Sequence, residues 1–444
     1  MKKIIFILFT ASYCCGLWAQ NDTLRLSLDQ ALQLGLSNRF DIKGNHINTD
    51  IATNRFLKTR KELLPDLSVN TKLIYNGQIQ PSIIPAGYLG FTEPRKIAIG
   101  MKNNTSFSLD LNYVIYKPGL YTDLRIASNN ILLEKERNSN SDMNVRIEIA
   151  EAYDNVLLKS FQYRIARETE NRYEEYYDLT KGKYTSGVIL ESDMLLAELD
   201  YKNAMAVTEK QKQDYVLSIK NLKYKINLPD QTQVILTDSL SSGNEEEITD
   251  VLPADASINR SEIRQIKIEQ AGIDLQLKKT KQNYLPSLSI VANYTQFFQG
   301  PGFNYSNNFY WAPVNYVGVK LSLPIAGSVK NINSAREYKL KSTQSDFMLK
   351  QETADIQYEI RESFARLSNA KLNLKMTRNN YMLSQKVCEL KKQQYNSGSF
   401  SYESLLGTEK SLSTAEQEYI SAVYNYLFAK ISYQKATGTV KSFK

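Results

Sequence analysis

The residue types that usually carry out chemistry are scarce in this sequence. His46 is the single histidine, so neither a histidine-rich zinc site nor a Ser-His-Asp relay has a second histidine to use. Gly300-Pro301-Gly302 lacks the following Gly-Lys-Ser/Thr that cradles phosphate. Ser368 and Lys371 fit Ser-x-x-Lys, but they lie in a helical pattern without the companion motifs of that enzyme class. We therefore predict no catalytic residues, no metal site, no cofactor and no enzyme activity.

The charge balance argues against nucleic acid as a partner. The chain has 55 basic and 47 acidic residues and a formal net charge of +8. This excess is spread along the sequence, and no basic cluster with interleaved aromatic residues is present. The 29 tyrosines are more typical of helix seams and barrel girdles than of cofactor ligands.

Residues 1–19 are typical of a secretory signal peptide. Two lysines precede the apolar run from Ile4 to Phe9, and we expect cleavage after Ala19. A membrane anchor is the alternative, but this run is shorter than the roughly 18 apolar residues that span a bilayer. The sequence therefore predicts an exported protein.

The cysteines raise one further alternative. Cys14 and Cys15 suggest lipid attachment, but bulky Tyr13 stands where a lipoprotein site has a small residue. Removal of the signal leaves Cys388 alone, so no disulfide can form within the mature chain. Packing must therefore hold the fold together.

Two glycine turns interrupt long helical patterns. Tyr184 to Gly187 and Tyr395 to Gly398 share the pattern Tyr-x-Ser-Gly and lie 211 positions apart. After the second turn, a heptad seam with steps of three and four runs through Leu405, Thr408, Leu412, Ala415, Tyr419, Ala422, Tyr426, Ala429, Tyr433 and Ala436. Because glycine supplies the backbone freedom of a tight reversal, each turn is predicted to be the tip of a helical hairpin.

The sequence is also internally duplicated. Three segments recur in the same order: Arg39–Ile42 as Arg260–Ile263, Leu64–Ser68 as Leu285–Ser289, and Ile147–Tyr153 as Tyr358–Phe364. We therefore predict two structural repeats, residues 20–228 and 257–437, separated by a connector at 229–256 and followed by a tail at 438–444.

Both repeats predict the same element order. The first reads as a helix over 27–61, a strand over 67–75, a loop over 77–102, a strand over 106–115, a helix over 118–181 and a return helix ending near 228. The second reads as a helix over 258–284, a strand over 288–295, a loop over 297–313, a strand over 316–323, a helix over 327–394 and a return helix. Each long helix would measure roughly 95–100 Å.

These elements predict an oligomer in a membrane. Alternating strands of about ten residues cross a bilayer when tilted, but the smallest membrane barrels have about eight strands. Four strands therefore need partner chains, and the exposed helix seams point to the same conclusion. The predicted fold class is mainly α with a small β part.

In this order of elements the sequence resembles the TolC family of outer-membrane efflux proteins. The resemblance rests on the helix-ending Leu64-Pro65 and Leu285-Pro286 and on the two turns, residues 183–188 and 394–399, and it covers the mature chain. It implies a homotrimer in outer-membrane lipid, with a twelve-stranded β-barrel (four strands per chain) and long α-helical hairpins that form a periplasmic tunnel. It also implies a periplasmic adaptor (membrane fusion) protein and an inner-membrane pump of RND or ABC type as partners.

The resemblance further implies site residues. The adaptor-docking tips would be Ser186, Gly187, Val188, Ser397, Gly398 and Ser399, although the valine before each family glycine is serine here. Asp193 matches an acid that lines the family's aperture, whereas Phe400 occupies the position of its basic partner. Glu191 and Glu403 are further aperture candidates because they lie nearby in sequence.

The predicted function is therefore that of an outer-membrane exit duct. It would conduct substrate passively to the exterior in a tripartite efflux or type I secretion system. A periplasmic coiled-coil adaptor or scaffold without a pore is the alternative, but it would not explain the paired strands. An exported hydrolase is a second rival, for which the sequence offers no plausible nucleophile and base.

Overall fold

The computed structural model describes residues 24–238, 260–324 and 327–438, and these form two compact units. Unit 1 contains residues 24–44, 139–238, 260 and 355–438, and unit 2 contains residues 45–138, 261–324 and 327–354. Each unit takes segments from both predicted repeats, whose boundaries stay a prediction. The expected signal peptide, most of the connector and the tail beyond Gly438 lie outside the described residues.

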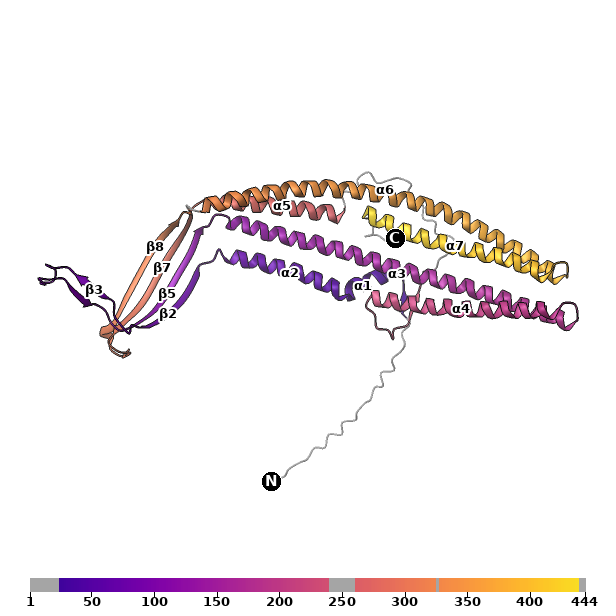
Figure 1. Cartoon of the computed structure of the whole chain (residues 1–444), viewed down its shortest axis with the longest axis horizontal. Coiled ribbons are helices and arrows are strands. Elements are labelled where there is room, and N and C mark those ends of the chain that lie inside the picture. Colours follow the sequence, from indigo (N-terminus) through magenta and orange to yellow (C-terminus); the bar gives the residue numbers. More distant parts are fainter. Residues whose placement is uncertain (1–23, 239–259, 325–326, 439–444) are drawn as a thin grey trace, which may run out of the picture. The chain divides into compact units, whose positions relative to one another are not determined.

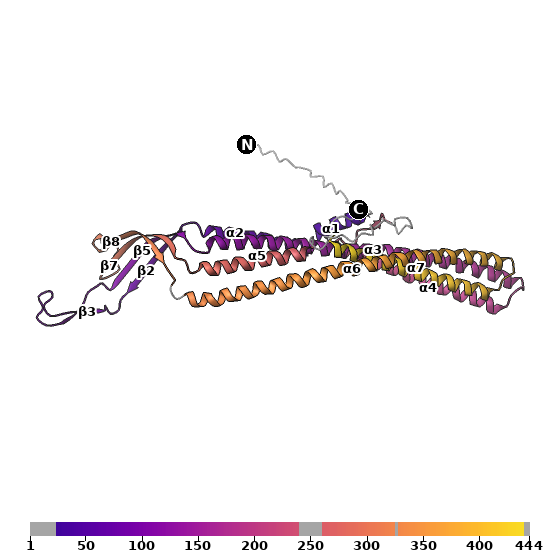
Figure 2. The same ribbon diagram turned by 90° about the horizontal axis from the view of Figure 1, so that it is seen from above.

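Unit 2 is built on a four-stranded antiparallel sheet. The strands β2 (Asp66–Tyr75), β5 (Asn103–Tyr116), β7 (Ser287–Gly300) and β8 (Trp311–Ser322) lie side by side in that order, as Figures 1 and 2 show. The four predicted strands are therefore confirmed. The predicted loop at 297–313 was too long, because Phe298 is fully buried against Trp311 and Tyr305 and extends the pairing of β7 with β8.

The two faces of this sheet differ in polarity. In one row of the register, Leu109 lies between Val69 and Tyr294, and in the next Asp110 lies between Ser68 and Asn293. Asp110 accepts hydrogen bonds from Asn70 Nδ2 (2.9 Å) and Asn293 Nδ2 (2.6 Å) on the polar face. No described segment covers the apolar face, where Val69 is 74% exposed. A sheet with this alternation has one face for lipid and one for water.

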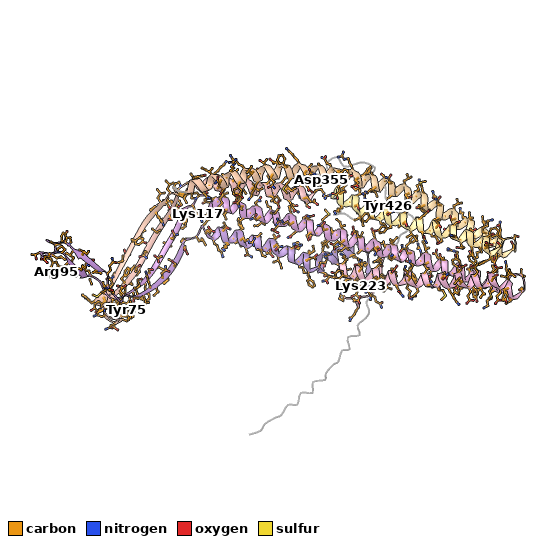
Figure 3. All side chains as sticks on the ribbon, viewed as in Figure 1. Tyr75, Arg95, Lys117, Lys223, Asp355 and Tyr426 are labelled. Carbon is orange, nitrogen blue, oxygen red and sulfur yellow. The ribbon has the colours of Figure 1, made fainter. Side chains whose placement is uncertain are left out.

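A small hairpin lies within the predicted loop at 77–102. Strands β3 (Pro81–Ile84) and β4 (Arg95–Ala98) pair antiparallel, which the sequence did not predict because each strand has only four residues. In Figure 3 the hairpin, marked by Arg95, extends past the end of the sheet where Tyr75 lies, away from Lys117.

Polar contacts join the helices of unit 2. On α3 (Leu120–Thr185), Thr122 donates to Gln282 Oε1 (2.6 Å) of α5 (Ser261–Gln282), and Asp123 pairs with Lys279 (2.6 Å). No helix within the described ranges carries a stretch apolar and long enough to traverse a bilayer.

Unit 1 contains a core that the sequence did not predict. Strands β1 (Leu24–Leu26) and β6 (Val234–Leu236) pair in parallel, and each is too short to show alternation. The buried Tyr153 hydroxyl donates to Asp238 Oδ2 (2.6 Å) and lies 3.1 Å from Leu26 O. This contact fixes the strand pair on α3.

The helix predicted over 27–61 is divided in two. The helix α1 (Leu28–Asn38) begins after Ser27, as predicted, and Ser27 forms a capping box with Gln30. Arg39 is extended (ψ 133°) and separates α1 from α2 (Phe40–Lys61). The Arg39 guanidinium pairs with Glu148 (3.0 Å), and in the second repeat Arg260 pairs with Glu359 (3.1 Å). The duplicated motifs therefore supply the same ion pair twice.

Two helical hairpins complete the fold. The helix α3 returns as α4 (Glu191–Lys225), and α6 (Gly327–Asn396) returns as α7 (Tyr402–Thr437); each pair lies side by side in Figures 1 and 2. Seam residues of α7 are buried, as predicted: Leu405, Leu412, Ala415, Ala422, Ala429 and Ala436.

Candidate functional site

The two predicted tips have the same backbone structure. At the end of α3, Val188 N donates to Lys183 O (3.0 Å) and Gly187 N to Tyr184 O (2.9 Å). At the end of α6, Ser399 N donates to Gln394 O (3.0 Å), and Gly398 N donates to Tyr395 O (3.1 Å). This pair of bonds is the Schellman motif, which satisfies carbonyls that a helix end leaves free.

Glycine is required at both turns because of the backbone conformation, and not because a larger side chain would lack room. The φ angles are +70° at Gly187 and +77° at Gly398, a region that costs an L-residue free energy. A Cβ added at either position would meet no atom within 4 Å. A side chain at either position would therefore project into space that no described residue fills.

The surfaces of the two tips differ. At the first tip, Val188 and Leu190 are 71% and 72% exposed, so the turn presents an apolar surface. At the second tip, Ser397 and Ser399 are exposed and their hydroxyl oxygens lie 3.3 Å apart. Ser186 is also exposed, with its hydroxyl bonded to Gly182 O (2.9 Å). Sequence reasoning missed Leu190, whose exposure at a helix start is visible only in the structure.

The two tips are tied together within the chain. Lys183 Nζ donates to Tyr395 O (2.5 Å) and lies 3.8 Å from the centroid of the Tyr395 ring. The Tyr395 hydroxyl is 3.0 Å from Thr180 Oγ1. Burial lowers the pKa of Lys183 and raises that of Tyr395. A cation of α3 therefore holds the end of α6, a contact that sequence reasoning missed.

The aperture candidates lie at the starts of α4 and α7. Glu191 and Glu403 are exposed and Asp193 is half-buried in the first turns of these helices. Among the described residues, no ion pair involves these three carboxylates. Acids in a first helical turn are favoured by the helix dipole.

A lysine side chain lies close to Phe400. Its ring packs against the cluster of buried residues at the tips, and Lys391 Nζ lies 4.3 Å from the ring centroid. A basic group from α6 therefore reaches the place where the resemblance expects a basic side chain from the turn.

Behind the tips lies a buried charge cluster that sequence reasoning also missed. Arg172 of α3 contacts two carboxylates of α7, Glu409 (3.4 Å) and Glu416 (3.2 Å). Glu409 Oε1 also accepts from the Tyr176 hydroxyl (2.6 Å) and the Cys388 thiol (2.9 Å). The seven-residue spacing of the two acids beside the seam was the available signal, because it places both on one helix face.

The cluster is shielded from water, since Glu409 is 1% and Glu416 4% exposed. Burial raises the pKa of the Cys388 thiol to about 12. Burial also raises the pKa of Glu416, against the opposing effect of Arg172. The Arg172 guanidinium is therefore the shared ion-pair partner of two buried carboxylates, Glu409 and Glu416.

No set of three or more His, Cys, Asp or Glu side chains in the described ranges is placed to hold a metal ion. His46 is exposed on α2. The tips present two exposed glycine turns, followed by Glu191, Asp193 and Glu403 in the first turns of α4 and α7.

Comparisons with known proteins agree with this geometry. The family model described as "Outer membrane efflux protein" matches residues 252–439. The alkaline protease secretion protein AprF of Pseudomonas aeruginosa is 19% identical over 329 residues, which cover 72% of this chain and 67% of that protein.

Solved structures match over nearly the whole chain. CusC superposes with a TM-score of 0.73 at 16% identity, covering 94% of this chain and 93% of that one. The CmeC outer membrane channel of Campylobacter jejuni gives 0.71 at 16% identity, covering 93% and 85%. VceC of Vibrio cholerae gives 0.71 at 12% identity, covering 93% and 96%.

A two-faced sheet of four strands together with two long helical hairpins is thus the fold of outer-membrane channel proteins. The matches to the outer membrane efflux protein model and to AprF agree with the resemblance found in the sequence.

Proposed function

We propose that three copies of this chain form the exit duct of a tripartite efflux or type I secretion system in the outer membrane. The sheet of unit 2 carries this proposal. Within the described residues, its edge strands β2 and β8 each pair on one side only, and no segment covers its apolar face. Open edges are not tolerated in lipid, because their N–H and C=O groups lack partners there. Twelve strands from three chains would close the barrel.

The helical hairpins are proposed to line a periplasmic tunnel and to meet an adaptor at their tips. Ser186, Gly187 and Val188 would form one docking surface, and Ser397, Gly398 and Ser399 the other. Open space in front of both glycines supports this proposal. Asp193, Glu191, Glu403 and Phe400 would line the narrow end.

An inner-membrane pump of RND or ABC type would supply the energy. The relative AprF is named for secretion of a protease, and CmeC is described as an outer membrane channel. A deletion strain distinguishes the cargo classes: loss of an extracellular polypeptide indicates secretion, and sensitivity to dyes and detergents indicates efflux of small molecules.

Membrane fractionation and gel electrophoresis test the duct itself. The protein should fractionate with the outer membrane, run as a trimer unless boiled, and conduct ions in a planar bilayer. A soluble monomer in the periplasm would support the scaffold alternative instead.

A further inference from the structure

Unit 1 contains a cavity of about 520 Å³ among α3, α4 and α7. Its walls include Gln162 and Tyr173 of α3, Asp200 and Gln211 of α4, and Glu416 of α7. The volume falls within the range of about 300–1,000 Å³ that holds small organic ligands.

Two walls of the cavity carry acceptors without donors. Gln162 Oε1 and Gln211 Oε1 are buried, and neither receives a hydrogen bond from any residue in the described part of the chain. A buried acceptor without a donor costs free energy, so most such groups in proteins have a partner. A ligand with N–H groups would satisfy both oxygens.

The cavity also carries surplus negative charge. Glu416 is 4% exposed and shares the Arg172 guanidinium with Glu409. Asp200 adds a carboxylate from the opposite wall, where it accepts from the Tyr402 hydroxyl at 3.3 Å. Burial raises the pKa of both Asp200 and Glu416.

We propose that this cavity binds an organic cation with several N–H donors, a ligand of the polyamine class. Ammonium groups would balance the charge of Glu416 and Asp200, while further N–H groups would bond to Gln162 and Gln211. The ligand would contact α4 and α7, the return helices of both tips, and would therefore hold the two hairpins together. The site stands apart from the tip surfaces proposed for docking.

Calorimetric titration of the purified trimer with spermidine at low ionic strength tests the proposal. We expect saturable binding to the wild type, weakened about tenfold or more by Asp200→Asn and by Gln211→Leu. Both variants leave the contact between Arg172 and Glu416 intact. Glu418→Gln removes a carboxylate from an exposed position of α7 and should bind spermidine as the wild type does.

Tetraethylammonium is the matched control ligand, because it carries positive charge without N–H donors and should bind far more weakly. Equal loss of affinity in Asp200→Asn and Glu418→Gln would indicate surface attraction and overturn the proposal. Absence of saturable binding to the wild type would overturn it as well. Bilayer conductance of the same preparation distinguishes failure of this proposal from failure of the proposed channel function. A trimer that conducts ions but does not bind spermidine contradicts the polyamine site and does not contradict the channel.

Discussion

At the scale of single residues, Asp193 combines partial burial with the lack of any described ion-pair partner. If three copies surround the narrow end of a channel, their charge should favour cations. Asp193→Asn should therefore reduce cation selectivity, measured as the reversal potential in a KCl gradient. Asp50→Asn, an equal change of charge at an exposed position of unit 2, is the control. An unchanged reversal potential in Asp193→Asn would remove this residue from the aperture.

Ser186 and Ser397 separate docking from simple turn formation. Arg at either position should leave the Schellman bonds intact, because these come from backbone atoms. We expect Ser186→Arg and Ser397→Arg to insert and conduct normally but to lose export and crosslinking to the adaptor. Ser411→Arg, on an exposed part of α7 beyond the tip, should retain both. Normal export by both tip variants would place docking elsewhere on the helices.

Features of single residues could be predicted from the sequence where they depend only on the geometry of the backbone. The positive φ angles at Gly187 and Gly398 follow from the need to reverse two helices in a short turn. The contact of Lys183 with Tyr395 could not be predicted, because it joins residues 212 positions apart. Glu409 and Glu416 had a visible spacing, but their shared partner Arg172 is more than 230 positions away.

At the scale of elements, the turns can be tested by pairs of alanine substitutions. Gly398 (φ +77°) and Gly407 both lack any atom within 4 Å of an added Cβ, but Gly407 lies within α7 without a positive φ. Gly398→Ala should therefore destabilise unit 1 by about 1–2 kcal/mol, and Gly407→Ala should stabilise it by about 0.5–1 kcal/mol. Thermal unfolding followed by circular dichroism measures both; destabilisation of similar size in the two variants would contradict this account.

The duplicated ion pairs should differ in their contribution to stability. Arg260 is buried and also donates to Lys435 O (3.1 Å) and Ala436 O (3.0 Å) at the end of α7. Arg260→Ala should cost about 3 kcal/mol, because it leaves these carbonyls without their charged donor. Arg39→Ala should cost about 1 kcal/mol, since its partners Asp41 and Glu148 are partly exposed to water. Equal shifts of the unfolding temperature would contradict the difference.

Elements could be predicted from sequence when they are long enough to show a period. The seam of α7 and the alternation of β5 extend over many residues, so their patterns are clear. Strands β1, β3, β4 and β6 have three or four residues each, and only their tertiary pairing defines them. At the break between α1 and α2, Arg39 pairs with Glu148, 109 positions away, a contact that no local pattern indicates.

At the scale of the whole molecule, closure of the barrel predicts which strands meet between chains. Cysteines scanned along β2 against β8 should include pairs that give covalent trimers after oxidation. The pair Leu109→Cys and Tyr294→Cys, which face each other within one chain, should give only monomers on a denaturing gel. The native Cys388 is buried, so it should not form disulfide bonds between chains and serves as a control. If no β2–β8 pair links chains, the proposed barrel is wrong.

Sequence alone could indicate an oligomer but not its geometry. Uncovered apolar residues and too few strands show that partners are needed, whereas the angle between strands and the order of chains depend on packing across an interface. The prediction of a trimer rests on the resemblance to the TolC family and not on the residue pattern. The alternating faces of the sheet, by contrast, follow directly from the residue pattern and are confirmed by the register.

The unlike surfaces of the two tips have a consequence for symmetry. In a trimer, a partner that senses only the backbone would meet six equivalent turns, whereas one that senses side chains would meet two alternating sets of three. An assembly of identical partner subunits must then either occupy every second tip or direct its contacts at the shared glycine turn. If the proposed docking depends on side chains, the difference between Val188 and Ser399 would restrict a matching partner to three-fold order.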